Sequence, residues 1–148
     1  MTLANPRFTA SYERVFGRGI GLGESADAFF ERFYANFLAQ PGVEPLFAGT
    51  DMSRQAQMLR KSFFHLVTFQ MLNEPTPELQ RLGAVHAEQD VPVDMFDVWL
   101  EALLTTIKEF DPEFCEATQL AWCWALAPGI SFVKAALLEE QSSQSHSE

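Results

Sequence analysis

The sequence has few cysteines, no secretion signal and no long uninterrupted apolar run. Only two of its 148 residues are cysteines, Cys115 and Cys123, and they lie eight positions apart within one predicted helix. That separation is too long for a disulfide bond, so we expect two free thiols and a reducing, cytoplasmic location. No stretch reaches the roughly 18 uncharged apolar residues of a transmembrane helix, so no membrane span is expected.

Basic residues are also scarce. The chain has 10 Lys and Arg against 20 Asp and Glu, which gives a formal charge of -10 and a pI near 4.7. Because no basic stripe is available to neutralise phosphates, we expect neither a nucleic acid nor an anionic membrane as a partner. The chain also lacks a glycine-rich phosphate loop, the metal-binding patterns CxxC and HExxH, and a Ser or Cys nucleophile with a matching base.

Sustained alternation of apolar and polar residues is absent as well, and apolar residues recur instead at intervals of three and four. We therefore expect an all-α fold, with a single domain over residues 1–138 and a disordered polar tail over 139–148. Helices are predicted over residues 6–17, from Ser25 to the Pro41-Gly42 turn, from Asp51 or Ser53 to about residue 72, over 77–86, over 92–110 and from Asp111 onward.

Two further expectations concern the start and the interior of the last predicted helix. Asp111 and Pro112 have the residue types of an N-cap and a first helical position, and Pro128-Gly129 is expected to kink the helix or to start a new turn. The three tryptophans are expected to pack between the last two helices; they are Trp99, Trp122 and Trp124.

Three polar residues interrupt otherwise apolar helix faces. His86 ends the stripe Leu79, Leu82, His86, where the spacing calls for a third apolar side chain, and Tyr34 and Gln55 interrupt two other faces. An imidazole on an apolar face can coordinate a buried metal centre, while a phenol and a carboxamide can donate hydrogen bonds to a group bound there. Each residue also has an ordinary structural interpretation: a hydrogen-bonded core histidine, a tyrosine bonded to a backbone carbonyl, and a glutamine at the solvent edge.

Three segments follow one another along the chain: FYANFLAQPGVEPLF at residues 33–47, RQAQMLRKSFFHLV at 54–67 and LQRLGAVHAEQDVPVDMFDVWLEALLTTIKEF at 79–110. Within them Pro41 is followed six positions later by Phe47, and His86 precedes Phe96 by ten. In this combination the chain resembles the globin family over roughly residues 25–135. It is most similar to single-domain bacterial haemoglobins and to the globin part of flavohaemoglobins. The resemblance implies a globin fold, a three-over-three helical sandwich.

The resemblance also assigns roles around a haem group. It implies that His86 is the proximal ligand of the iron of haem b, that Phe47 packs on the haem face, that Leu82 packs beneath the haem and that Phe96 lies near the proximal side. No CxxCH motif is present, so the haem would be held without covalent attachment.

On the distal side, Tyr34 and Gln55 would hydrogen-bond the gas ligand, with Tyr34 as the principal donor, and Leu59 would form an apolar wall. The chain has one position fewer between Tyr34 and Phe47 than is usual in these relatives. Two alternatives therefore stay open: Phe33 in place of Tyr34, and Arg54 in place of Gln55.

The function implied is reversible binding of oxygen, nitric oxide and carbon monoxide at a five-coordinate haem iron, by a protein that is not primarily an enzyme. The alternatives are a nitric oxide dioxygenase that works with a separate reductase, and a gas-sensing or interaction module. Flavohaemoglobin-type globins place a tyrosine and a glutamate around the ligand histidine, where this chain has Phe96 and Leu137. A peroxidase-like role is therefore not favoured. A monomer or a homodimer is expected.

Overall fold

The computed structural model describes residues 6–17, 25–72, 77, 81 and 92–146. Over these ranges the chain forms α1 (Pro6–Phe16), α2 (Ser25–Leu38), the short 3-10 helix η1 (Glu44–Phe47), α3 (Met52–Leu72), α5 (Met95–Phe110) and α6 (Glu116–His146). No strand occurs in the described ranges, and the all-α prediction is confirmed. The helix predicted over 77–86 lies almost entirely outside the described residues.

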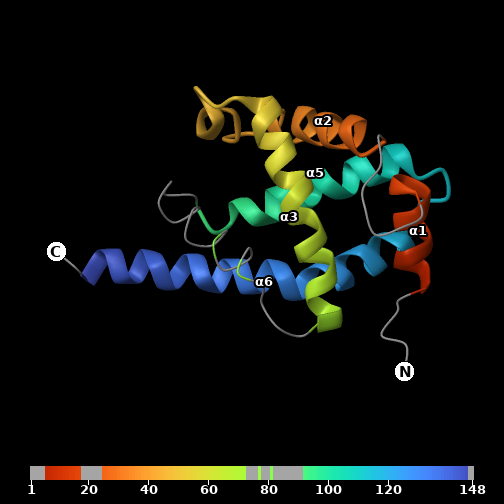
Figure 1. Ribbon diagram of the computed structural model, residues 1–148. Coiled ribbons are helices and arrows are strands. Elements are labelled where there is room, and N and C mark those ends of the chain that lie inside the picture. Colours follow the sequence, from red (N-terminus) through yellow and green to blue (C-terminus); the bar gives the residue numbers. More distant parts are fainter. Residues whose placement is uncertain (1–5, 18–24, 73–76, 78–80, 82–91, 147–148) are drawn as a thin grey trace.

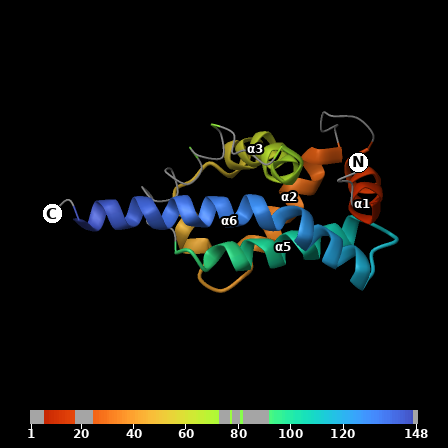
Figure 2. The same ribbon diagram turned by 90° about the horizontal axis from the view of Figure 1, so that it is seen from below.

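The helices pack against one another at several crossings. α2 lies along α5, and α3 packs against both α2 and α6. Figure 1 shows α3 crossing α6, and Figure 2 shows α5 and α6 side by side with α1 across one end. The C-terminal turns of α6 extend beyond the other described helices in both views.

Aromatic side chains fill the space between these helices. Phe29, Phe30 and Phe33 of α2 recur at spacings that place them on one broad face, and each is at most 1% exposed. Phe63 of α3 continues the cluster, with its ring centroid 5.5 Å from that of Phe30 and 6.4 Å from that of Trp122 on α6. Favourable ring geometry adds about 0.5 to 1.5 kcal/mol per pair to the stabilisation that burial provides. Among the described residues, many of the phenylalanines therefore belong to the core.

A close approach of α3 and α6 depends on a glycine. A Cβ atom added at Gly129 would lie 3.0 Å from the carbonyl oxygen of Leu66 and 3.2 Å from its Cδ2. Pro128 precedes this glycine inside α6, and one helix runs through both residues, so of the two expectations for Pro128-Gly129, a kink or a new turn, the new turn does not form. The helix continues to His146, into the segment 139–148 for which the sequence predicts a disordered tail.

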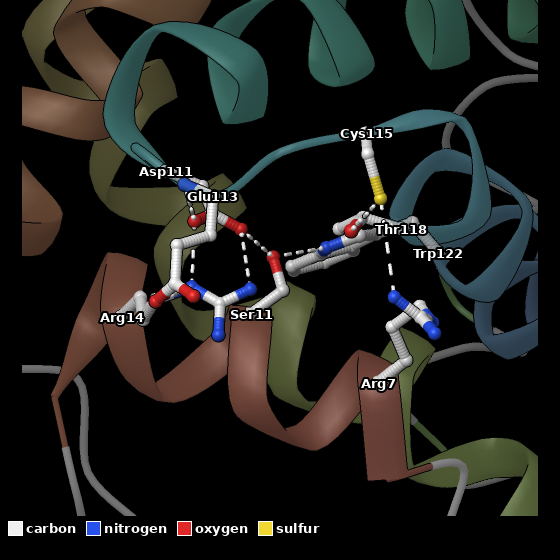
Figure 3. A network of polar contacts seen from close by, with 8 residues as sticks. All are labelled: Arg7, Ser11, Arg14, Asp111, Glu113, Cys115, Thr118 and Trp122. Carbon is white, nitrogen blue, oxygen red and sulfur yellow. Dashed lines mark hydrogen bonds and ion pairs between the residues drawn. The ribbon is translucent and has the colours of Figure 1, made fainter.

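A buried carboxylate joins α1 to the connection between α5 and α6. Asp111 is 2% exposed and accepts hydrogen bonds from Ser11 Oγ at 2.6 Å, from Arg14 Nε at 2.6 Å and from the backbone N–H of Glu113 at 2.9 Å. Ser11 Oγ in turn accepts a hydrogen bond from Trp122 Nε1 at 2.8 Å, and Figure 3 shows these side chains in one network. Burial raises the pKa of Asp111, but the hydrogen bonds from Arg14, Ser11 and Glu113 outweigh it, so the pKa lies below its usual value.

The prediction that Asp111 is the N-cap of the last helix is wrong. Asp111 is the C-cap of α5, where its N–H donates a hydrogen bond to the carbonyl oxygen of Ile107 at 2.8 Å, and α6 begins only at Glu116.

The residue before α6 is Cys115, whose pKa is lowered by hydrogen bonds with the Thr118 side chain and with backbone N–H groups of the first turn. Both cysteines of the chain are free, as predicted.

The tryptophans differ from the prediction too. Trp122 is fully buried but faces α1, with its ring 4.7 Å edge-on from that of Phe8, and Trp99 packs on Phe33 of α2 at 5.7 Å. Trp124 is 70% exposed. The prediction fails because α6 is apolar around most of its circumference, so the spacing of its large residues does not identify the buried face.

The same composition gives one described helix the length and hydropathy of a membrane span. It covers Glu116–Glu139 of α6, with a mean hydropathy of 1.4 over its most apolar window, of which 44% is buried. Core helices of globular proteins share these properties, and α6 packs on α1, α3 and α5.

Asp111→Asn is expected to lower the free energy of unfolding at pH 7 by about 1.5 to 3 kcal/mol, the range for hydrogen bonds to a charged group. Because the folded-state pKa of Asp111 is depressed, its stabilising effect is complete above the unfolded pKa of about 3.9 and is lost as the pH falls through the folded value. Urea denaturation at pH 7 and in acid measures both effects, and the difference between the two proteins should shrink in acid.

The matched control is Asp27→Asn, which removes a carboxylate from an exposed ion pair with Arg60. We expect this variant to change the free energy of unfolding far less, because exposed ion pairs contribute little. Equal stability of Asp111→Asn and the wild type at pH 7 would contradict the structural role given to Asp111.

Candidate functional site

Tyr34 and Gln55 lie together where α2 meets α3. Tyr34 is 6% exposed on α2, and Gln55 is half-buried in the first turn of α3. Gln55 Nε2 donates a hydrogen bond to Tyr34 Oη at 3.4 Å. Because the phenol oxygen accepts this bond, the proton of Tyr34 can be donated to a further acceptor in the site, and accepting one bond strengthens a hydroxyl as a donor.

The protonation state of Tyr34 follows from its burial. Removal from water raises the pKa of Tyr34 to about 12, although the hydrogen bond from Gln55 acts in the opposite direction. The phenol is therefore fully protonated at neutral pH. It is a neutral hydrogen-bond donor and not an anionic ligand.

Phe47 covers one side of this pair. Its ring centroid lies 6.0 Å from that of Tyr34 and 5.8 Å from that of Phe37, both in edge-on geometry. Phe47 is the last residue of η1, whose segment runs between Gly42 (φ 82) and Gly49 (φ 79). Glycine adopts this left-handed backbone without steric cost, so the short helix can turn sharply at both ends and present Phe47 to α2.

An open hollow of about 380 Å³ lies beside Phe47. Its wall is mostly apolar and comes from the end of α2, from η1 and from the start of α3; the lining residues are Leu38, Glu44, Pro45, Phe47, Ala48 and Met52. A hollow with such a wall can accept the edge of a flat apolar group, with a single carboxylate at its rim.

The start of α3 determines the direction of Gln55. Asp51 Oδ1 accepts hydrogen bonds from the backbone N–H groups of Ser53 at 3.1 Å and of Arg54 at 3.3 Å, which is the bonding pattern of an N-cap. Of the two N-caps considered from the sequence, Asp51 is therefore the one used. In the resulting first turn Gln55 faces α2, while Arg54 is exposed.

The structure also distinguishes between the two alternatives for the distal residue on α2, Tyr34 and Phe33. Phe33 is fully buried on a different side of α2, stacked on Phe37 at 5.5 Å and edge-on to Trp99 of α5 at 5.7 Å. Tyr34, the next residue, faces α3. The geometry thus brings together Tyr34 and Gln55 and does not bring Phe33 to Gln55.

The other predicted site residues are placed as follows. Leu59 is 8% exposed on α3, one turn beyond Gln55, and Phe96 is partly buried at the start of α5. Leu82 and His86 lie outside the described residues.

Sequence reasoning missed two residues at the site. Phe37 lies one turn beyond Tyr34 and supports the ring of Phe47, and helical spacing could have identified it. Met52 lines the hollow from the first residue of α3. No local signal marks Met52, because its position depends on how α3 meets η1.

The described residues fit the distal side of a haem. They offer an apolar wall from Phe47 and Leu59 and one buried neutral donor, Tyr34, which together are the features that control ligand binding on that side of a haem. Within the described ranges no group of three or more His, Cys, Asp or Glu residues is placed to hold a metal ion. A haem would depend for its iron on His86, as the sequence predicts.

Comparison with solved structures gives an informative relative. No protein-family model matches the chain, and no curated protein is significantly similar to it. A solved structure from Pseudomonas aeruginosa PAO1, a protein described as structurally highly homologous to a human hemoglobin, superimposes with a TM-score of 0.73 at 30% sequence identity. The match covers 88% of this chain and 95% of that one. At this identity and coverage the chain belongs to the same family as the Pseudomonas protein, a family with a globin-like fold.

Proposed function

We propose that this protein binds one haem b and uses it to bind oxygen, nitric oxide and carbon monoxide reversibly. The observation that carries the proposal is the buried phenol of Tyr34, which accepts a hydrogen bond from Gln55 beside an apolar wall. The globin-like fold supports the haem, because the Pseudomonas relative shares the fold with a hemoglobin. When bound, haem iron supplies the coordination position at which a diatomic gas attaches.

In this proposal Tyr34 donates its proton in a hydrogen bond to the gas ligand. Gln55 holds the phenol in place from the α3 side and leaves the proton directed away from itself. Because the pKa of Tyr34 is about 12, the donor stays protonated throughout the physiological pH range. A donor of this kind favours ligands with partial negative charge, such as oxygen.

Phe47 and Leu59 keep water away from the polar pair. Both are apolar and at least partly buried, and they come from different elements, η1 and α3. Leu82 and Phe96 are proposed to pack on the proximal side, where His86 is the ligand of the iron. A ligand held by donors in a dry pocket leaves slowly, so the proposal favours tight binding, as in scavenging or sensing, over delivery.

Tyr34→Phe is expected to increase the oxygen dissociation rate of the haem-loaded protein by about 10- to 150-fold. This range corresponds to the loss of one hydrogen bond of about 1.5 to 3 kcal/mol to a charged acceptor. Stopped-flow displacement of oxygen by carbon monoxide measures the rate. Tyr12→Phe is the matched control, because Tyr12 is the other tyrosine of the chain and packs against Trp122 of the core.

We expect Tyr12→Phe to leave the oxygen dissociation rate unchanged. If Tyr34→Phe also leaves it unchanged, Tyr34 does not contact the gas ligand and the distal part of the proposal is wrong.

A second prediction concerns the titration of Tyr34 itself. In the Tyr12→Phe background the remaining tyrosine should ionise with a pKa of about 12, and Gln55→Leu should raise that pKa further by removing a hydrogen bond that lowers it. Absorbance of tyrosinate after a rapid pH jump measures the midpoint before the protein unfolds.

Burial of Tyr34 also makes the stability of the fold depend on pH. Folding favours the protonated phenol, so the stabilisation is complete below the unfolded pKa of about 10 and is lost as the pH rises toward about 12. A midpoint near 10 in the folded protein would show that Tyr34 is open to water.

A further inference from the structure

The outer face of α6 is exposed, and its residues between Ala117 and Leu138 carry no charge. Leu120 is 63% exposed, Trp124 70% and Leu138 51%, and smaller residues lie between them on the same face. We call this surface the α6 stripe and define it by Ala117, Leu120, Trp124, Ser131, Ala135 and Leu138, all of which are exposed.

The stripe lies outside the core that the described residues form. The opposite face of α6 is buried through Trp122, Leu126 and Val133 and packs on α3. Between Ala117 and Leu138 the only charged residue is Lys134, which is partly buried in an ion pair with Asp97 at 2.9 Å. An exposed apolar face of this extent is unusual for a protein that functions alone, because contiguous apolar surface usually marks an interaction site.

The spacing of the stripe suits packing against another helix. Its residues recur at intervals of three, four and seven positions, so they form one narrow band along α6. At about 1.5 Å per residue the band is roughly 30 Å long. Seen from below in Figure 2, α6 lies toward the viewer between α3 and α5, and its C-terminal turns extend past both.

We propose that the α6 stripe binds the same stripe of a second copy of the chain, antiparallel, about a two-fold axis near Ala127. With this register each large residue meets a small one. Leu120 faces Ala135 of the second copy, Trp124 faces Ser131, and Leu138 faces Ala117. A two-fold contact is reciprocal, so the same pairs form twice, and alternation of large and small residues lets the two surfaces interdigitate.

The ends of the stripe are complementary in shape. An open hollow of about 220 Å³ lies between α1 and α6, lined by Arg7, Leu120 and Trp124 together with Ala117 and Ala121. The proposed register directs Leu138 of the second copy toward this hollow.

The ends are complementary in charge as well. Glu139 follows Leu138 and is exposed, so it would reach Arg7 at the rim of the hollow. A cation therefore meets an anion at both ends of the contact.

The absence of charge on the stripe itself favours a second copy over an oppositely charged partner. At a formal charge of -10, two copies repel each other over most of their surfaces. The stripe is an uncharged surface at which this repulsion is weakest. A partner recognised by charge would use the acidic surface instead.

Sedimentation velocity over a wide range of concentration tests the proposal. The wild type is expected to dimerise, and Trp124→Glu should weaken dimerisation by at least about 30-fold, as for a central aromatic contact residue. The control is Met58→Glu, which places the same charge at an apolar residue that is 50% exposed on α3, and it should leave the dissociation constant within about threefold. Circular dichroism verifies that each variant keeps its helices.

The reciprocal size exchange tests the register. Trp124→Ser alone and Ser131→Trp alone should each weaken the dimer, whereas the double variant should recover at least part of the loss because each Trp again meets a Ser. In the same way, Arg7→Glu should be rescued by Glu139→Arg.

Two results would overturn the proposal. One is a wild type that remains monomeric at every concentration, or a dimer that Trp124→Glu leaves unchanged. The other is a monomer that floats with phosphatidylcholine vesicles in a Trp124-dependent way, which would assign the stripe to a lipid surface.

Discussion

The packing of α2 on its neighbours is the constraint on which the rest of the structure depends. Phe29, Phe30 and Phe33 bury one broad face of this helix, and the one phenol on it, Tyr34, is buried with them. A buried hydroxyl without a partner costs about 1 to 3 kcal/mol, so α3 must approach in the orientation that offers Gln55. That same crossing positions η1, Phe47 and the hollow beside it, and so determines the geometry of the whole site.

Much of the helical structure could be predicted because its signals are local. Apolar spacing predicted α1, α3 and α5 nearly to their ends, and Pro41-Gly42 marked the turn after α2. Asp111 shows the limit of this reasoning. Asp-Pro is a sound local signal for a helix start, but the carboxylate instead bonds Ser11, 100 positions earlier, and no local pattern contains that information. Trp124 shows a second limit, because a helix that is apolar on both faces does not reveal which face is buried.

The candidate site also has residues that could be predicted from the sequence and residues that could not. Pairing of Tyr34 with Gln55 was predicted from the resemblance to globins, and the described geometry brings the two together. The contribution of Met52 could not be predicted, because it depends on how η1 meets α3. The exposed face of α6 has no part in this site. Its residues are separate from Tyr34 and Gln55 in the chain and in the fold, so gas binding and the proposed self-association can be tested independently.

The central claim is that this globin-like fold holds a haem through His86. The measurement that tests it most directly is the absorption spectrum of the purified protein after incubation with haem, recorded in the oxidised, reduced and carbon monoxide-treated states beside His86→Ala. The account predicts one haem per chain with an intense Soret band that shifts with carbon monoxide, and loss or displacement of that band in the variant. A wild type without a Soret band, or a band unchanged in His86→Ala, would contradict it.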